Sequence, residues 1–218
     1  MASASLVQDL WLGFEPRLRG RRLAPWDEPV TRLLLQLDVG QRLEDPAVVS
    51  LLEALAARHE VFAWEPRCGA SGAPGPESLE DARRLATDGG RRFGPRTVLL
   101  GGLGLGAWIA LALAGTPGLS GVVALAPTLA GAGSTAPQPS PLRSALAGAL
   151  SAAPPQLPSL VVEGHERPAA EAHAVGEWLA RSRGAAHLVV PGGDEEVLRP
   201  PWPAAIAGWA DALGRPSR

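Results

Sequence analysis

The sequence lacks several residue types, and each absence excludes a class of protein or site. Its 218 residues include no lysine, asparagine or tyrosine, and only one cysteine, Cys68. A single cysteine cannot build an internal disulfide framework or a cysteine-rich metal site, so we expect no bound metal. The formal net charge of −2 gives no bulk attraction to nucleic acid or to acidic membranes, and we expect neither as a partner.

Long apolar segments and targeting signals are missing as well. No apolar run free of charged and turn residues is long enough to span a bilayer, and no basic segment followed by an apolar core opens the chain. We therefore expect a cytoplasmic protein. Because every basic residue is arginine, as in many high-GC bacterial genes, arginine abundance is no evidence of phosphate recognition. We expect the densest basic group, Arg19, Arg21 and Arg22, to be the solvated edge of a hairpin.

What is present is the composition and the element order of a globular α/β protein. Hydrophobic residues make up 46% of the chain, and its length suits one domain, residues 1–218. After an N-terminal hairpin over 10–23, apolar strands alternate with helices, which predicts a mainly parallel sheet covered on both faces. Strands are expected at 31–37, 60–64, 97–101, 121–126, 160–163 and 187–190, and helices at 47–59, 77–93, 105–114, 169–181 and 203–213. Residues 130–158 are expected to form a flexible Ala/Gly/Pro-rich loop or short cover, with one short helix near 142–150 and no separate cap domain.

The stretch from Thr97 to Ala114, TVLLGGLGLGAWIALALA, organises the rest of the chain. Apolar residues lead into a glycine-rich turn over 101–106, and an Ala/Leu-rich run follows with the length of a buried helix. This order predicts a strand, a very tight turn and a helix.

The same order, strand then GxSxG then helix, resembles the nucleophile elbow of α/β-hydrolases, with Gly102 and Gly106 at the two glycine positions. Four further segments resemble parts of that family in the correct order: VFAWEPRCGASGAP, VVALAP, LVVEGHERP and LVVPGGDEE. In order, they match a strand followed by the family's D-x-R-G-x-G-x-S loop, the strand after the elbow helix, the end of the acid-bearing strand and the approach to the catalytic histidine. The chain thus resembles a minimal, capless α/β-hydrolase, and the resemblance implies that fold over the whole chain.

The resemblance also implies where a catalytic triad would lie, and none of its three residue types is there. Acyl transfer needs a nucleophilic serine, a histidine that takes its proton and a carboxylate that orients the histidine. The three positions hold Gly104, Arg167 and Glu195. The family's oxyanion-side His-Gly is replaced by Gln36-Leu37, although we expect the backbone N–H groups of Asp38 and Leu105 still to point into the pocket.

Relocated catalytic groups are the next candidates, because triad geometry follows roles rather than chain order. We expect His59, His173 and His187 to be partly exposed histidines without a role. His165 differs, since His165 and Glu166 follow the carboxyl end of a predicted strand, where open α/β sheets bind ligands.

Three functions stay open. The first is a catalytically degenerate hydrolase-like protein, a binding, scaffold or regulatory protein with a small apolar ligand or a protein partner; self-association is left open. Its pocket is expected to comprise Asp38, Gly102, Gly104, Leu105 and His165, without a cofactor. The second is a non-hydrolytic enzyme, such as a cyclase, lyase or isomerase of secondary metabolism, and the third is an esterase with relocated catalytic groups. The acid/base groups available to the second are Asp38, Glu163, His165, Glu166, Asp194 and Glu195.

Structural features distinguish the first two functions. A perturbed carboxylate facing His165 in a closed apolar cavity would favour an enzyme. A pocket filled by Leu37, Leu105 and Trp108 would favour a scaffold.

Residues 102–107, GLGLGA, also match the GxGxxG/A fingerprint of dinucleotide-binding proteins. That fingerprint needs an acidic residue after the following strand to bind the ribose, and no Asp or Glu lies between Gly89 and Val162. The motif normally opens its domain, whereas two core strands precede it here. We therefore do not expect a nicotinamide cofactor.

Overall fold

The protein is described by a computed structural model that covers residues 6–12, 17–25, 29, 31–68, 74–92, 97–128, 141–152 and 157–214. Eight strands form one sheet in the order β1-β2-β4-β3-β5-β6-β7-β8. The strands are β1 (Leu6–Leu12), β2 (Leu18–Ala24), β3 (Thr31–Gln36), β4 (Glu60–Trp64), β5 (Thr97–Leu103), β6 (Gly121–Leu125), β7 (Ser159–Gly164) and β8 (Ala185–Val190). All neighbours from β4 to β8 are parallel, while β2 pairs antiparallel with both β1 and β4.

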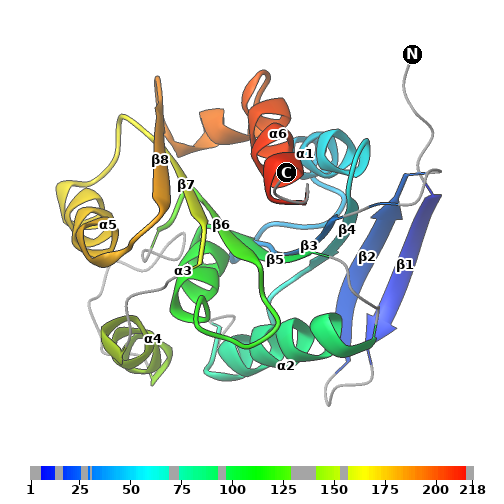
Figure 1. Cartoon of the computed structure of the whole chain (residues 1–218), viewed down its shortest axis with the longest axis horizontal. Helices are drawn as coiled ribbons and strands as arrows, with labels where there is room; N and C mark the ends of the chain where they lie inside the picture. Colours follow the sequence, from blue (N-terminus) through cyan, green and yellow to red (C-terminus); the bar gives the residue numbers. More distant parts are fainter. Residues whose placement is uncertain are drawn as a thin grey trace.

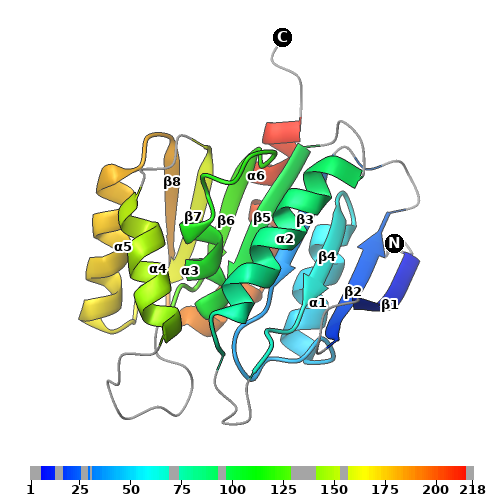
Figure 2. The ribbon, with the colours of Figure 1, turned by 90° about the horizontal axis from the view of Figure 1, so that it is seen from below.

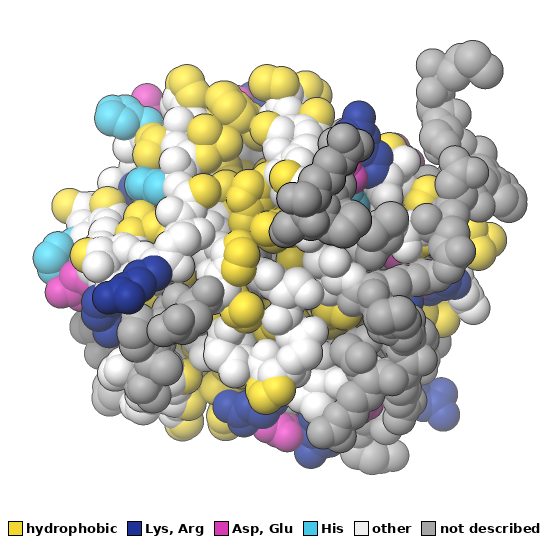
Figure 3. All heavy atoms as spheres, in the orientation of Figure 1, with side chains coloured by type: hydrophobic (Ala, Val, Ile, Leu, Met, Phe, Trp, Pro, Cys, Tyr) yellow, Lys and Arg dark blue, Asp and Glu magenta, His cyan; other side chains and the backbone are white. Residues whose placement is uncertain are grey.

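Helices cover both faces of this sheet, as Figures 1 and 2 show. On one face lie α1 (Pro46–Ala56), α6 (Trp202–Gly214) and the short 3-10 helix η1 (Asp194–Leu198). On the other face lie α2 (Glu77–Arg92), α3 (Leu105–Ala112), α4 (Pro141–Ala152) and α5 (Ala169–Arg181). Each layer encloses its own apolar core, because successive residues of the central strands point to opposite faces. Figure 3 shows hydrophobic side chains at the surface along the boundary between β8 and α6.

The predicted fold class is confirmed, and most predicted elements lie where the sequence placed them. The N-terminal hairpin, the strand at 60–64 and the helix at 169–181 are present, and the strand at 187–190 begins two residues earlier, at Ala185. Within the predicted 130–158 segment the structure has α4, whereas residues 130–140 and 153–156 lie outside the described residues. The helix η1 was not predicted, since five residues with three consecutive acids carry no clear helical period.

Among the residues that the structure describes, no three or more His, Cys, Asp or Glu side chains are grouped to hold a metal ion. No helix within the described ranges is both long enough and apolar enough to cross a membrane.

Candidate functional site

The turn between β5 and α3 has the sharp geometry that its glycines predict. Gly104, the residue before α3, has φ 55° and ψ −116°. Residues with a Cβ rarely adopt this conformation, and holding one there costs about 1–3 kcal/mol. A side chain at Gly102 would overlap the backbone of Gly106, so glycine is also needed where strand and helix approach each other. The predicted strand, tight turn and helix are therefore confirmed.

The space directly above Gly104 is occupied by the carboxylate of Asp38. A Cβ added to Gly104 would overlap the Asp38 carboxyl carbon and both of its oxygens. Asp38 lies two residues after the end of β3, and parallel pairing of β3 with β5 brings the carboxyl ends of both strands to the same edge. A serine at position 104 would thus compete with Asp38 for the same volume.

Asp38 also uses the backbone N–H groups at this edge. Its Oδ1 accepts a hydrogen bond from the Leu105 N–H at 2.9 Å and another from the Val39 N–H at 2.8 Å. The N–H that follows the nucleophile is one of the two oxyanion-hole donors in α/β-hydrolases. In this chain that donor already has an anionic acceptor from the protein itself.

The expectation that both predicted N–H groups would point into an open pocket is therefore wrong. The N–H of Asp38 donates to Oε1 of Gln41 at 3.0 Å, and the N–H of Leu105 donates to Asp38. This arrangement could not be predicted from the sequence, because the contact joins residues 67 positions apart. A pyrophosphate bound at the start of α3 would need the same Leu105 N–H, which here donates to Asp38.

Burial is the main reason that the pKa of the Asp38 carboxyl is raised. The two N–H groups lower that pKa in part, and the charge of Glu171 raises it further. The pKa of Asp38 is therefore higher in the folded than in the unfolded protein, which means that the fold favours the protonated carboxyl. The resulting stabilisation is complete below the unfolded-state pKa and is lost as the pH rises through the folded-state pKa.

Asp38→Asn should therefore raise the melting temperature by a few degrees near pH 7.5, and by less at pH 4. The amide oxygen can still accept both N–H groups, but no buried charge forms. Melting curves at both pH values for Asp38→Asn and for the exposed control Glu195→Gln measure the effect. An Asp38→Asn shift that is equal at both pH values, or negative at pH 7.5, would contradict it.

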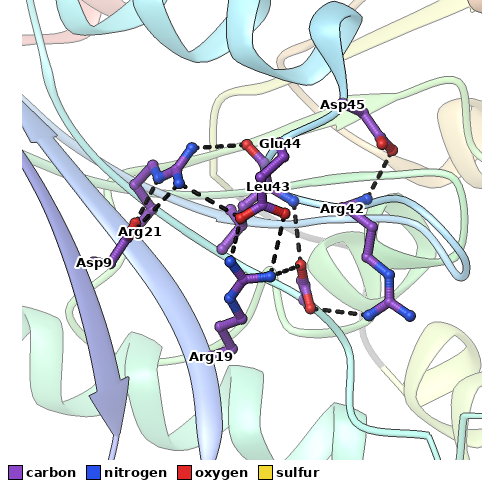
Figure 4. Close-up of polar contacts among 8 residues, drawn as sticks. Asp9, Arg19, Arg21, Arg42, Leu43, Glu44 and Asp45 are labelled. Atoms are coloured by element: carbon purple, nitrogen blue, oxygen red, sulfur yellow. Dashed lines mark hydrogen bonds and ion pairs between the residues drawn. The ribbon is translucent and has the colours of Figure 1, made fainter.

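A network of ion pairs holds the loop that carries Asp38 (Figure 4). Glu65, at the end of β4, is buried and accepts hydrogen bonds from Arg19, Arg42 and the Leu43 N–H, each at 3.1–3.2 Å. Arg21 donates to the Leu43 carbonyl at 2.9 Å and to a carboxylate oxygen of Asp9 at 2.6 Å. Arg22 forms an ion pair with Glu60 at 2.7 Å, so all three hairpin arginines contact carboxylates. The prediction of a solvated sheet edge is wrong, because β2 lies between β1 and β4.

Arg167, at the position of the family's acid, is buried between carboxylates. Only 2% of its side chain is exposed, and it forms ion pairs with Glu163 and Glu171 and donates to the Pro127 carbonyl. Glu171 also accepts from the Thr128 hydroxyl at 2.8 Å. An arginine held this way cannot orient a histidine as a carboxylate does, and its charge balances two buried acids instead.

The other predicted acid/base residues at this edge are separated. Glu195 and Glu166 are exposed, and His165 is exposed at the end of β7. Asp194 accepts a hydrogen bond from the Gly164 N–H at 2.8 Å, which ties η1 to β7, and burial raises the pKa of its carboxyl. The structure brings Asp38, Gly104 and Leu105 together as predicted, but within the described residues no side-chain hydrogen bond or ion pair joins His165 to any of them.

The remaining histidines divide into one buried and two exposed. His59 was expected to be partly exposed, but it is 1% exposed and its Nε2 lies 3.0 Å from the Ala207 carbonyl of α6. The prediction failed because α6, distant in sequence, packs on the end of α1. His173 is exposed as expected, and His187 is partly exposed, with Nε2 3.0 Å from Oε1 of Glu163.

Comparisons with known proteins agree with this geometry at the level of the fold. No family model matches the sequence, and no curated protein matches it. Solved structures do match, among them an esterase of Pyrococcus furiosus at 13% identity and TM-score 0.71, covering 97% of this chain and 94% of that one. A predicted CIB-like hydrolase of Thermoplasma acidophilum matches at 17% identity and TM-score 0.65, covering 97% and 99%.

Est1E of Butyrivibrio proteoclasticus matches at 10% identity and TM-score 0.72, covering 94% of this chain and 98% of that one. Identities this low show a common fold. Together with the strand order and the sharp turn at Gly104, they establish that the chain has the α/β-hydrolase fold.

Proposed function

We propose that this protein is a non-hydrolytic member of the α/β-hydrolase fold that acts as a scaffold or regulatory protein. The observation that carries the proposal is the Asp38 carboxylate, which lies over Gly104 and accepts the Leu105 N–H. Ester hydrolysis needs that N–H to stabilise a developing oxyanion. A fixed carboxylate there repels an oxyanion, so this site opposes the transition state of acyl transfer.

The packing around Asp38 supports a scaffold over a ligand-binding pocket. Leu37, Leu105 and Trp108, the side chains that would fill such a pocket, are 0%, 8% and 1% exposed. A surface groove does lie between α2 and α4, lined by Leu79, Arg83 and small residues of α4, but none of the predicted pocket residues lines it.

A non-hydrolytic enzyme receives less support from the same site. Asp38 does have a raised pKa, as a general acid or base would need. His165, its expected counterpart, is exposed rather than enclosed in an apolar cavity. The buried acids Glu163 and Glu171 are engaged by Arg167.

The proposal predicts that the pure protein hydrolyses p-nitrophenyl acetate and butyrate at the rate of buffer alone. It also predicts that no fluorophosphonate adduct forms, because no serine occupies the sharp turn. Hydrolysis is followed by absorbance and the adduct by intact mass, with an active serine esterase assayed in parallel.

Asp38→Ala and His165→Ala, purified in the same way, separate true activity from contamination. A contaminating esterase would give the same rate in all three preparations. A turnover above buffer that disappears in either variant would overturn the proposal and would make the altered residue part of an active site.

A further inference from the structure

The strand β8 is the last strand of the sheet, and among the described residues no further strand pairs with its outer edge. It pairs with β7 on one side only. Its sequence, AAHLVV, contains no Asp, Glu, Lys or Arg and no proline. Val189 is 45% exposed, one of three large hydrophobic side chains that are exposed among the described residues.

The direction of the β8 backbone groups follows from two hydrogen bonds. The carbonyls of Gly184 and Val190 accept from the N–H groups of Ser159 and His165, so these even-numbered residues face β7. In a parallel pair the N–H and C=O of one residue point to the same side, and successive residues alternate. Ala185, His187 and Val189 therefore present their backbone donors and acceptors outward.

Exposed edges of this kind are normally protected by charges, proline or a covering segment, because they can pair with another strand. The opposite edge strand, β1, also exposes two hydrophobic side chains, Leu6 and Val7, but it carries a charged residue, Asp9, which forms an ion pair with Arg21. Figure 3 shows mainly backbone, hydrophobic side chains and a histidine over the flank where Figure 1 places β8.

The two ends of β8 carry opposite charges. Arg181 and Arg183 precede the strand and are exposed, whereas Asp194 and the exposed Glu195 follow it. If two β8 strands pair antiparallel, the basic end of each lies beside the acidic end of the other. Parallel pairing would place like charges together, so the charges favour the antiparallel arrangement and a second copy as the partner.

We propose that two copies of this chain associate through antiparallel pairing of β8 about a two-fold axis at His187. Ala185 of each copy then lies opposite Val189 of its partner, and each directly opposed pair of outward-facing residues exchanges two backbone hydrogen bonds. The pairing joins both sheets into one and closes the edge of each chain, so assembly stops at the dimer. This inference does not depend on whether the protein is hydrolytic.

Sedimentation velocity of the full chain between micromolar and hundred-micromolar concentrations tests the dimer. The wild-type protein is expected to be dimeric, Val189→Pro monomeric, and Val189→Thr dimeric. Proline removes the outward N–H and leaves the β7 pairing intact, and threonine keeps both the N–H and a β-branched side chain. A wild-type monomer throughout this range overturns the proposal, as does a Val189→Pro variant that remains dimeric.

A charge swap between positions 183 and 195 tests the same dimer independently of whether Val189→Pro folds. Arg183→Glu is expected to weaken the dimer about tenfold or more, and adding Glu195→Arg should restore it. The six residues of β8 lie between positions 183 and 195 and span about 20 Å, so the two charges cannot pair within one copy and rescue acts between copies. Ala204→Lys on the exposed face of α6 should have no effect; dissociation by Ala204→Lys, or no rescue by the swap, contradicts β8 pairing.

Discussion

Replacing Arg167 by methionine is expected to lower the free energy of unfolding by about 3–5 kcal/mol, a fall in Tm of roughly 6–20 °C. The Arg167 side chain is almost fully buried, and its removal takes away the guanidinium that pairs with both Glu163 and Glu171. The contacts of Glu163 with His187 and of Glu171 with Thr128 remain. Removing one partner of a buried ion pair lowers the free energy of unfolding by far more than the intact pair contributes to it, because the other charge then stays in a low-dielectric site without full compensation.

A compensating variant distinguishes the effect of uncompensated buried charge from the effect of losing the packing of the Arg167 side chain. Glu163→Gln and Glu171→Gln together with Arg167→Met should regain most of the lost stability, since no buried charge then remains unpaired. Glu195→Ala, at an exposed position of the same edge, should change Tm by less than a degree or so. Urea unfolding measures the stability of Arg167→Met, of the triple variant and of Glu195→Ala. An Arg167→Met protein as stable as wild type would show that Arg167 does not balance the two acids.

Gly104→Ser is expected to destabilise the protein by more than the roughly 1–3 kcal/mol of backbone strain at a positive φ, and to create no ester hydrolysis. The serine Cβ would overlap the Asp38 carboxylate, so Asp38 must move and release the N–H groups of Leu105 and Val39. Among the described residues no histidine forms a hydrogen bond with Asp38 or with this turn, so no base is placed to activate the new hydroxyl. Thermal melting and p-nitrophenyl ester turnover measure the two parts of the prediction.

Gly40→Ala supplies the matched control. Gly40 also has a positive φ, 84°, but a Cβ there would meet no atom within 4 Å. Its cost therefore reports backbone strain alone, and the excess cost of Gly104→Ser reports the collision with Asp38. Adding Asp38→Ala to Gly104→Ser should remove part of that excess. Equal costs at the two glycines, or a clear gain of turnover, would refute this account of the turn.

The fold could be predicted because its signals are local and ordered along the chain. The glycine-rich turn between an apolar strand and an Ala/Leu-rich helix predicted the strand, turn and helix around Gly104. Four weaker segments in the right order predicted the elements on either side of it. The identities of Gly104, Arg167 and Glu195 are known from the sequence, whereas their assignment to the three triad positions rests on the resemblance and stays a prediction.

The side-chain contacts could not be predicted, because they depend on packing between distant elements. Asp38 reaches Leu105 across two adjacent strands, and no pattern in either segment specifies that contact. His59 looked like the exposed end of a helix until α6 was placed against it. Arg167 did have a signal, the spacing of Glu163, Arg167 and Glu171 at intervals of four, but the three residues span a strand, a loop and a helix.

These contacts give the emptied catalytic positions a structural role. Asp38 satisfies the N–H at the start of α3, and Arg167 joins the end of β7 to the first turn of α5. At the edge of the sheet that holds substrates in related folds, the described polar groups Asp38 and Arg167 thus bind other parts of the same chain. The pairing of β8 with a second copy, proposed above, would place the contact with a partner at a different edge of the molecule.

The most direct test of this account is an NMR titration of the backbone amide protons of Leu105 and Val39 in the wild-type protein. We predict that both resonances shift together as Asp38 ionises, with a midpoint above the usual range of an aspartate pKa, and that Asp38→Asn abolishes the shift. A Leu105 amide that does not respond to pH or to Asp38→Asn would show that the carboxylate does not occupy the oxyanion position, and would contradict the account.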